Sequence, residues 1–437
     1  MSFANKNIFP YGSMINKSGN LEIGGCDVTE LAEQYGTPLY IYDESTIRKM
    51  CREFVGEFST RYSDIKVAYA SKAFMSLAMA KIAHEEQLCL DVVSGGEIAI
   101  AAHAGFPTKK MYFHGNNKTP HELSEAIDQG VGTIVVDGFH ELNTLDSIAK
   151  SKGVVQEIML RLSPSVDAHT HGHTTTGILD VKFGFSIETG DSTIAIRQSM
   201  ESSNLDLKGI HFHLGSPIFE LKPYSTAIDS VLDYLYQFID EGLNLREFSP
   251  GGGFAIGYMG NMLPPPISVY AETIASMLQK KCGELVIKEP TLIIEPGRSI
   301  VGRAGVALYT VGVIKEIPTV RTYVSLDGGM GDNIRPALYG AEYEAVIANK
   351  MNLDNQNKIT LAGKYCESGD ILVKDIELPP IASGDIVAIP SSGAYCLSMS
   401  STYNMHPRPA VIMVNNGSSR LIRRRETYKD LMALDVI

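Results

Sequence analysis

The chain has 437 residues, enough for a large core and two domains, and its 44% hydrophobic and 20% charged residues are ordinary for a globular protein. The formal net charge of -12 argues against a nucleic-acid-binding surface, so local arginines or backbone N–H groups must hold any anionic ligand. None of the six cysteines forms a CxxC pair, residues 1–12 lack a signal-peptide pattern, and no apolar run reaches membrane-spanning length. We therefore expect free thiols and a cytoplasmic enzyme.

Residues 1–42 carry short strand-like pieces, which we expect to pair with a C-terminal β domain. Between residues 43 and 300, short apolar runs alternate with helical patterns, such as those at 96–105, 120–130, 139–152 and 223–241. The candidate strands begin near Lys66, Leu88, Lys110, Thr133, Gln156, Leu207, Arg246 and Thr291. Eight strands with intervening helices predict a (β/α)8 TIM-type barrel, with an open doubly wound sheet as the alternative.

After residue 300 the pattern changes to strands without long helices between them. We expect these strands at 301–313, 321–326, 365–373, 385–389 and 410–414, separated by Gly and Pro residues. Residues 301–437 are therefore predicted to form a mostly β domain. The fold class is α/β, with a barrel followed by that domain.

Lys72 follows the apolar run Val67-Ala68-Tyr69-Ala70 and precedes an amphipathic stretch at 75–86. The lysine is therefore expected at the carboxyl end of the first barrel strand, where enzymes of this architecture keep their chemistry. An amine in a partly dry pocket can lose its proton and attack a carbonyl group. A solvated lysine at a strand end is the alternative.

The sixth strand is expected to end at His211 and His213, which strand alternation places on the same face. These imidazoles suit a metal ion, stacking on a flat aromatic ligand, or a structural role. Three histidines at 169, 171 and 173 also resemble a metal cluster, but they lie in a Thr- and Gly-rich segment with no obvious fourth ligand. We expect no metal at either place.

The seventh strand ends in Gly251, Gly252 and Gly253, whose backbone N–H groups can surround an anion such as phosphate. A flexible turn is the alternative for this glycine run. The eighth strand ends in Glu295-Pro296-Gly297-Arg298. There the acid suits a cationic ring nitrogen and the arginine suits an anion, unless the two form a salt-bridged turn.

The β domain adds Arg335 and Tyr339, a cysteine between polar neighbours at 366, and the segment ending in Tyr395. Taken together, the segments suit a ligand with a carbonyl that reacts with an amine, a flat ring, a ring nitrogen that needs an acid, and a phosphate. Pyridoxal 5'-phosphate (PLP) has all four features.

Many ordered motifs run from one end of the chain to the other. They include Gly25 to Ala32, Gly36 to Tyr40, Ala70-Ser71-Lys72-Ala73, Val93 to Glu97, Lys182 to Phe185, His213-Leu214-Gly215-Ser216, Gly251 to Gly253, Glu295 to Arg298, Cys366 to Asp370, Gly393-Ala394-Tyr395, Asn404 and Pro407-Arg408-Pro409. In these motifs the chain closely resembles the fold-type III PLP-dependent decarboxylases, and among them the branch that acts on meso-2,6-diaminopimelate.

The resemblance implies an alanine-racemase-like barrel with a β domain, working as a homodimer with shared active sites. It implies that Lys72 forms the covalent link to PLP and that Cys366, from the other subunit, is the catalytic proton donor. The implied cofactor-binding residues are Lys72, Asp91, His213, Ser216, Gly251, Gly252, Gly253, Glu295, Gly297, Arg298 and Tyr395. The implied substrate-binding residues are Arg298, Arg335, Tyr339, Glu367 and Tyr395.

The function implied is decarboxylation of meso-2,6-diaminopimelate to L-lysine, the last step of lysine biosynthesis. We expect Arg298 or Arg335 to bind the distal carboxylate of this diamino dicarboxylic acid and Glu367 to bind its ammonium group. The alternatives are a decarboxylase of D-ornithine or D-lysine, ornithine or arginine, and a non-catalytic PLP-binding regulator. Two residues depart from the family pattern, Pro217 in place of Gln and Cys396 in place of Gly.

Overall fold

The computed structural model describes residues 3, 5–166 and 180–437 and divides the chain into two compact units. The barrel unit comprises Met50–Ala255 and Pro265–Gly297, and the β unit comprises Met1–Lys49, Ile256–Pro264 and Arg298–Ile437. The domain bounds drawn from the sequence, at residues 42 and 300, stay a prediction. The histidines at 169, 171 and 173 lie outside the described residues.

The barrel unit contains a closed ring of eight parallel strands. Each strand pairs with its neighbours in the order β9, β11, β12, β13, β5, β6, β7 and β8, and pairing of β8 with β9 closes the ring. The strands are β5 (Ile65–Ala70), β6 (Cys89–Val92), β7 (Met111–Phe113), β8 (Thr133–Val136), β9 (Gln156–Ser163), β11 (Leu205–His211), β12 (Glu247–Ser249) and β13 (Thr291–Ile294). A two-residue strand, β10 (Phe185–Ser186), pairs with β9. The predicted barrel is therefore confirmed, and so are the positions of its eight strands.

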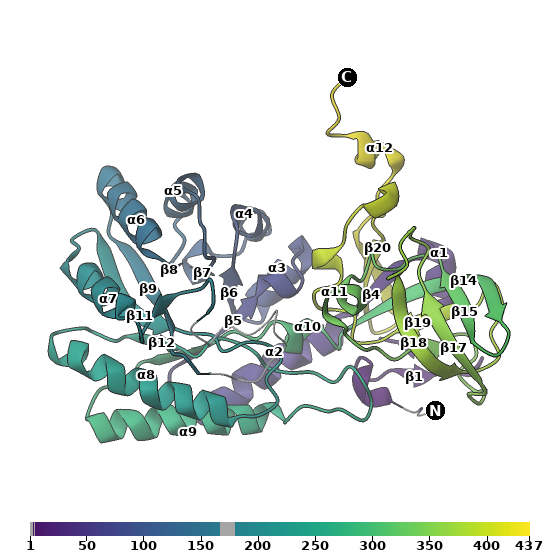
Figure 1. The fold of residues 1–437 in the computed structure, drawn as a ribbon, viewed down its shortest axis with the longest axis horizontal. Helices are drawn as coiled ribbons and strands as arrows, with labels where there is room; N and C mark the ends of the chain where they lie inside the picture. The colour runs from purple at the N-terminus through teal and green to yellow at the C-terminus, as the bar shows by residue number, and fades with distance from the viewer. Residues whose placement is uncertain (1–2, 4, 167–179) are drawn as a thin grey trace. The chain divides into compact units, whose positions relative to one another are not determined.

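Helices surround this ring of strands (Figure 1). They are α3 (Leu77–Glu85), α4 (Gly95–His103), α5 (Pro120–Asp128), α6 (Phe139–Lys152), α7 (Asp191–Glu201), α8 (Lys222–Asp240) and α9 (Ile267–Leu285). Local sequence sets their ends. The Ser76 side chain accepts from the Met79 N–H at the start of α3, Thr119 and Glu122 form a capping box on α5, and Gly153 ends α6 in the left-handed region.

Side chains fill the inside of the barrel. One buried layer comes from six strands and consists of Ala68, Cys89, Tyr112, Val135, Met159 and Ile293. Nearer the amino ends of the strands, the buried Glu247 binds Lys66 at 2.6 Å and Lys208 at 3.3 Å. Because side chains fill the middle and the amino ends of the barrel, we expect its functional residues at the carboxyl ends of the strands.

The β unit contains a three-stranded sheet and a larger nine-stranded sheet. Their strands are β1 (Met14–Ile15), β2 (Leu21–Ile23), β3 (Cys26–Asp27), β4 (Leu39–Asp43), β14 (Gly305–Ile317), β15 (Arg321–Leu326), β16 (Val346–Ile347), β17 (Asn357–Ala362), β18 (Ile371–Leu378), β19 (Ile386–Ile389), β20 (Ala410–Asn415) and β21 (Ser418–Arg423). The helices of this unit are α1 (Val28–Tyr35), α10 (Arg298–Val301), α11 (Arg335–Tyr339) and α12 (Tyr428–Met432), while α2 (Glu44–Ser59) crosses the division between the units. Strand β4 lies between β14 and β20, so a piece of the N-terminal segment completes the larger sheet.

Two expectations from the sequence are wrong. The strand expected at 365–373 begins only at Ile371, because Asp370 accepts from the N–H groups of Tyr365 and Met330 and folds the preceding residues into a turn. In the barrel, β11 ends at His211, so His213 lies beyond the strand and does not share its face.

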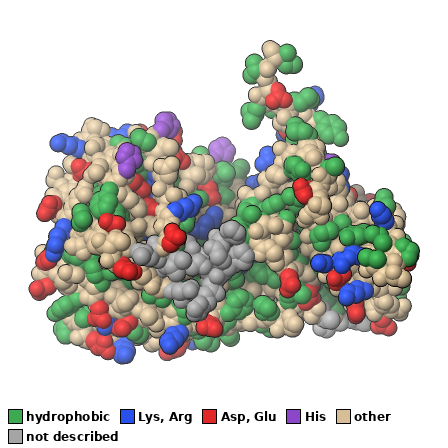
Figure 2. Space-filling view, viewed as in Figure 1, with side chains coloured by type: hydrophobic (Ala, Val, Ile, Leu, Met, Phe, Trp, Pro, Cys, Tyr) green, Lys and Arg blue, Asp and Glu red, His purple; other side chains and the backbone are tan. Residues whose placement is uncertain are grey.

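Charged side chains of both signs are interspersed on the face of the molecule drawn in Figure 2. No described helix is long and apolar enough to cross a membrane. The six cysteines form no disulfide; five are buried and Cys366 is exposed.

Candidate active site

Lys72 lies in a short 3-10 turn, Ser71–Ala73, directly after β5. Its Nζ atom lies 3.3 Å from Oδ2 of Asp91, which belongs to the neighbouring strand β6. The Asp91 side chain is 1% exposed, whereas the Lys72 side chain is 45% exposed. A buried carboxylate therefore orients an accessible amine at the carboxyl end of the barrel, as the chemistry predicted for Lys72 requires.

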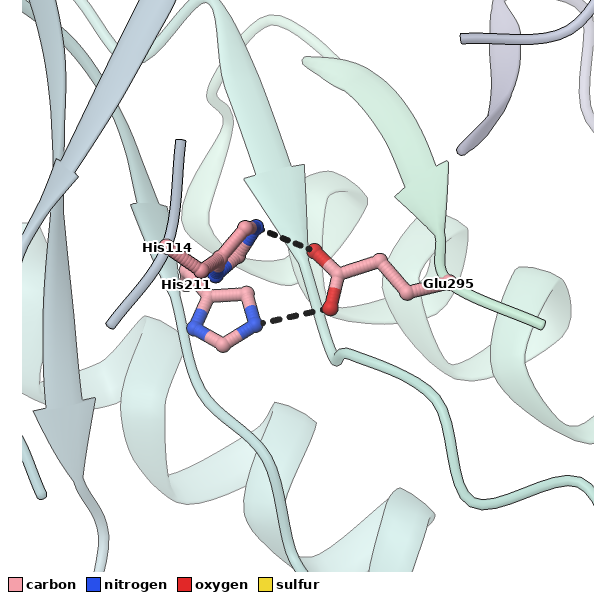
Figure 3. Close-up of side chains that lie close together, drawn as sticks. All are labelled: His114, His211 and Glu295. Atoms are coloured by element: carbon pink, nitrogen blue, oxygen red, sulfur yellow. Dashed lines mark hydrogen bonds and ion pairs between the residues drawn. The ribbon is translucent and has the colours of Figure 1, made fainter. Parts of the chain in front are cut away.

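Glu295 follows β13, and its side chain meets residues from two other strands (Figure 3). Oε2 accepts a hydrogen bond from His211 Nε2 at 3.0 Å, and Oε1 accepts one from the Ser249 hydroxyl at 3.0 Å. His114 Nε2 lies 3.4 Å from Oε1, and the two imidazole rings meet edge to face with centroids 4.8 Å apart. These groups form one buried cluster.

Burial alone would raise the pKa of Glu295, but the neighbouring His211, which also donates a hydrogen bond to it, outweighs burial and lowers the pKa to about 2. Burial holds the pKa of His114 well below its usual value, so that imidazole is neutral near pH 7. Glu295 is thus a buried anion at neutral pH. The ligand atoms of His114, His211 and Glu295 all lie within 4.8 Å of one another, a spacing that would also suit a metal ion.

The glycine run lies between two neighbouring strand ends. A Cβ atom on Gly252 would come 2.2 Å from the carbonyl oxygen of Glu295, so only glycine fits there. Its N–H donates to Nδ1 of His213 at 3.2 Å, and the Ile218 N–H donates to the Gly253 carbonyl at 2.8 Å. These bonds bring the segment that contains Ser216 beside the glycines, as a shared phosphate site requires.

His213 and Gly251 also have defined surroundings. Burial and the nearby Lys72 hold the pKa of His213 well below its usual value, so the imidazole is neutral, as stacking on a cationic ring requires. The Gly251 N–H donates to the Ser249 hydroxyl at 3.1 Å. Two of the three glycine N–H groups therefore already have partners inside the chain.

The sequence analysis gave no role to four polar residues at this end of the barrel. They are Glu97, His114, Arg161 and Ser249. The Arg161 guanidinium lies 4.4 Å from the Phe183 ring centroid, and Glu97 accepts from the Val93 N–H at 2.8 Å. The sequence offered one signal for two of these residues. His114 and Ser249 stand at the carboxyl ends of the third and seventh barrel strands, where catalytic residues are expected.

In the β unit, two buried arginines both lie close to one tyrosine ring. Arg298 is 7% exposed and Arg335 is 6% exposed. Their guanidinium carbons lie 5.7 Å and 4.5 Å from the Tyr258 ring centroid, and that of Arg298 lies 4.8 Å from the Tyr395 ring. Among residues 3, 5–166 and 180–437, no carboxylate forms an ion pair with either arginine.

Three other predicted residues also lie in the β unit. Tyr339 ends the short helix α11 and is partly exposed. Cys366 and Glu367 are exposed in the turn that Asp370 organises, and the Cys366 N–H donates to Asn404 Oδ1 at 2.8 Å. Lys72 belongs to the other unit, so the roles assigned to Cys366 and Glu367 stay predictions.

Residues 44–302 match the family model described as "Pyridoxal-dependent decarboxylase, pyridoxal binding domain", which covers more than half of the chain. The chain belongs to the pyridoxal-dependent decarboxylase family. Among relatives in this family, diaminopimelate decarboxylase of Bacillus subtilis (strain 168) is 46% identical over 427 residues, 96% of each chain. Diaminopimelate decarboxylase of Synechocystis sp. is 44% identical over 442 residues, covering 99% of this chain and 94% of that one.

A solved pyridoxal-dependent decarboxylase has the same architecture. Diaminopimelate decarboxylase from M. jannaschii, in co-complex with L-lysine, superposes with a TM-score of 0.91 at 34% identity and covers 97% of this chain and 98% of that one. The fold-type III barrel with its β domain and the use of PLP are therefore confirmed for the chain.

The barrel unit fits this cofactor. The buried atoms His114 Nε2, His211 Nδ1 and Asp91 Oδ1 have no hydrogen-bond partner among the described residues, which suits a pocket that a polar ligand completes. Lys72 offers an amine and Glu295 an anion. Lys72, Glu295, His213 and the glycine run would hold the aldehyde, the ring nitrogen, the ring face and the phosphate of PLP, respectively.

Proposed function

We propose that the chain decarboxylates meso-2,6-diaminopimelate to L-lysine and CO2, with PLP as its cofactor. Relatives that span nearly the whole chain carry this name, at 40–46% identity. The single structural observation that carries the proposal is the pair of buried arginines without a carboxylate partner in the described residues. Two buried cations favour a ligand with an anionic group beyond the reacting centre.

The barrel unit would hold the cofactor and keep it in the reactive charge state. When bound, PLP supplies an electron sink for the electron pair that CO2 leaves behind. Lys72 gives up a proton to become a nucleophilic amine, and Asp91 orients it. Glu295, held ionised by its hydrogen bonds, favours a proton on the ring nitrogen, which strengthens that sink.

The β unit would select the substrate. After CO2 is lost from one end, the other end of the molecule keeps a carboxylate and an amine. Arg298 and Arg335 bind that carboxylate, and Glu367 binds the ammonium group. A site built around a polar group can reject an analogue that lacks it by about 10⁴-fold or more, so diamino acids without a second carboxylate fit poorly.

Cys366 would supply the proton that replaces CO2. A thiol suits this role because Sγ can give up its proton to carbon and take another from solvent. The proton moves from Sγ to the substrate carbon that lost CO2, and solvent restores the thiol. We also propose a cytoplasmic homodimer in which Cys366 and Glu367 serve the active site of the partner subunit.

The test is turnover by the purified, PLP-loaded protein with a panel of substrates. We expect CO2 and L-lysine from meso-2,6-diaminopimelate, and no turnover of ornithine, arginine or D-lysine. The Lys72→Ala variant is the matched control, with activity reduced by at least about 10³-fold because a covalent group is lost. Rapid turnover of a simple diamino acid, with none of diaminopimelate, would disprove the substrate assignment.

A further inference from the structure

The two buried arginines of the β unit connect to a chain of polar side chains. Arg298 donates from Nη1 to the Tyr258 hydroxyl, and Arg335 donates from Nη1 to the Tyr343 hydroxyl. The two tyrosine rings meet edge to face, with centroids 5.3 Å apart and planes at 78°. The Cys396 Sγ atom lies 3.7 Å from the Tyr343 hydroxyl. Tyr343 therefore lies between an arginine and a thiol.

The donors and acceptors of this chain fit one continuous direction. The Ala394 carbonyl accepts from the Cys396 thiol at 3.6 Å, so the lone pairs of Sγ are left to accept from the Tyr343 hydroxyl. The lone pairs of that hydroxyl are then left for Arg335, whose guanidinium can only donate. Burial raises the pKa of both Tyr343 and Cys396, so each keeps its proton near pH 7.

We propose that Tyr343, held by Cys396, is a positioning residue that fixes the Arg335 guanidinium for the carboxylate that remains on the product. The inference rests on the proposed function. A long arginine side chain loses conformational freedom when it binds a ligand, and fixing it beforehand reduces that cost. The Tyr258 ring, 4.5 Å from the guanidinium carbon of Arg335, limits the same side chain from another direction.

Cys396 is one of the two departures from the family pattern noted in the sequence. It stands where the family resemblance leads us to expect glycine, which has no side chain to accept from Tyr343. Cys396 is 0% exposed, so water does not replace its sulfur atom as the acceptor for the Tyr343 hydroxyl. We therefore assign to this buried thiol a role in substrate affinity that acts through Tyr343.

The test compares two ligands that differ by one carboxylate, L-lysine and cadaverine. Their dissociation constants are measured by calorimetry with the PLP-loaded protein. We expect Tyr343→Phe to weaken L-lysine binding about tenfold, since it removes a hydrogen bond to a charged group, and to leave cadaverine binding unchanged. The KM for diaminopimelate should rise by the same factor, with little change in kcat.

Two substitutions at Cys396 test the inference independently if the Tyr343→Phe protein does not fold. Cys396→Gly should weaken L-lysine binding about threefold, a fraction of one hydrogen bond, and Cys396→Ser should restore it because a hydroxyl also accepts. Tyr62→Phe is the control, since it removes a buried hydroxyl that donates to the Pro290 carbonyl in the barrel unit.

Equal weakening of both ligands would show a general structural role and overturn the inference, and so would unchanged L-lysine binding in all three variants. Failure of the proposed function would be seen in the unsubstituted protein itself. That protein would bind L-lysine no better than cadaverine, or would fail to decarboxylate diaminopimelate.

Discussion

The two units treat buried charge in opposite ways. In the barrel unit, the Glu295 carboxylate receives hydrogen bonds from His211 and Ser249, so its charge is satisfied inside the chain. In the β unit, Arg298 and Arg335 contact tyrosine hydroxyls and ring faces, but no carboxylate of the described residues pairs with them. A satisfied charge keeps its state without a ligand, whereas an uncompensated one makes an anionic ligand stabilising. The difference supports two separate parts of the proposal: the barrel unit carries an anion suited to the cofactor, and the β unit carries cations that an anionic ligand would compensate.

Removal of the satisfied charge in the barrel unit is the most severe test of this contrast. In Glu295→Gln, the shape and one hydrogen bond are kept, but the anion that favours a proton on the ring nitrogen is lost. We expect kcat to fall by about 10²- to 10³-fold, the scale observed when one preorganised electrostatic group is removed. The absorbance of bound PLP as a function of pH should shift as well, because it reports the ring charge independently of turnover.

Glu157→Gln is the matched control for that variant. Glu157 lies near the amino end of β9 and pairs with Lys208 at 2.8 Å, far along the strand from the catalytic end. Its substitution should leave kcat and the cofactor spectrum unchanged. An active Glu295→Gln protein with an unaltered spectrum would contradict the role given to the carboxylate.

The next test removes an unsatisfied charge. Arg335→Met keeps a long apolar stem and deletes a buried cation, so we expect KM for diaminopimelate to rise about 10²-fold. Folding should not suffer in proportion, because an uncompensated buried charge is itself costly. The measurements are steady-state kinetics and the melting temperature of each variant.

Arg321→Met serves as the control for the β unit. Arg321 has a carboxylate partner, with Nη1 3.1 Å from Asp375, and it lies on β15. Its substitution should leave KM unchanged. If Arg335→Met instead lowered the melting temperature and left KM unchanged, Arg335 would be a structural residue and the contrast between the units would fail.

Much of the barrel could be predicted because each strand is a short apolar run that ends at a polar residue. Lys72, Glu295 and the glycines stand at such ends, so their common location follows from the periodicity alone. Where one side chain overrides the pattern, the prediction failed. Asp370 captures two backbone N–H groups, and the strand expected from residue 365 begins only at Ile371.

The polar partners of the site could not be predicted for a different reason. Tyr258 contacts Arg298 from 40 residues away along the chain, and Tyr343 contacts Arg335 from eight residues away. Nothing local to either tyrosine distinguishes such a contact from ordinary core packing. His114 likewise reaches Glu295 across the barrel mouth from the third strand. These contacts form only when the chain folds and its segments pack together, so local sequence patterns do not predict them.

The smallest expected effect concerns a carboxyl group of the barrel unit that lacks the compensation given to Glu295. Burial raises the pKa of Glu97 from 4.5 to about 7, although the Val93 N–H bond opposes the shift. Between these values the folded chain binds a proton that the unfolded chain has released, so stability falls as pH rises from about 4.5 to about 7.

The Glu97→Gln side chain stays neutral at every pH, and we expect this substitution to remove about 1–3 kcal/mol of the loss of stability. The check is the melting temperature at pH 5 and pH 8, with the exposed Glu188→Gln as control. An identical pH dependence in Glu97→Gln and the unsubstituted protein would show that Glu97 is ionised across the whole range, and that the barrel unit stabilises this partly buried anion too.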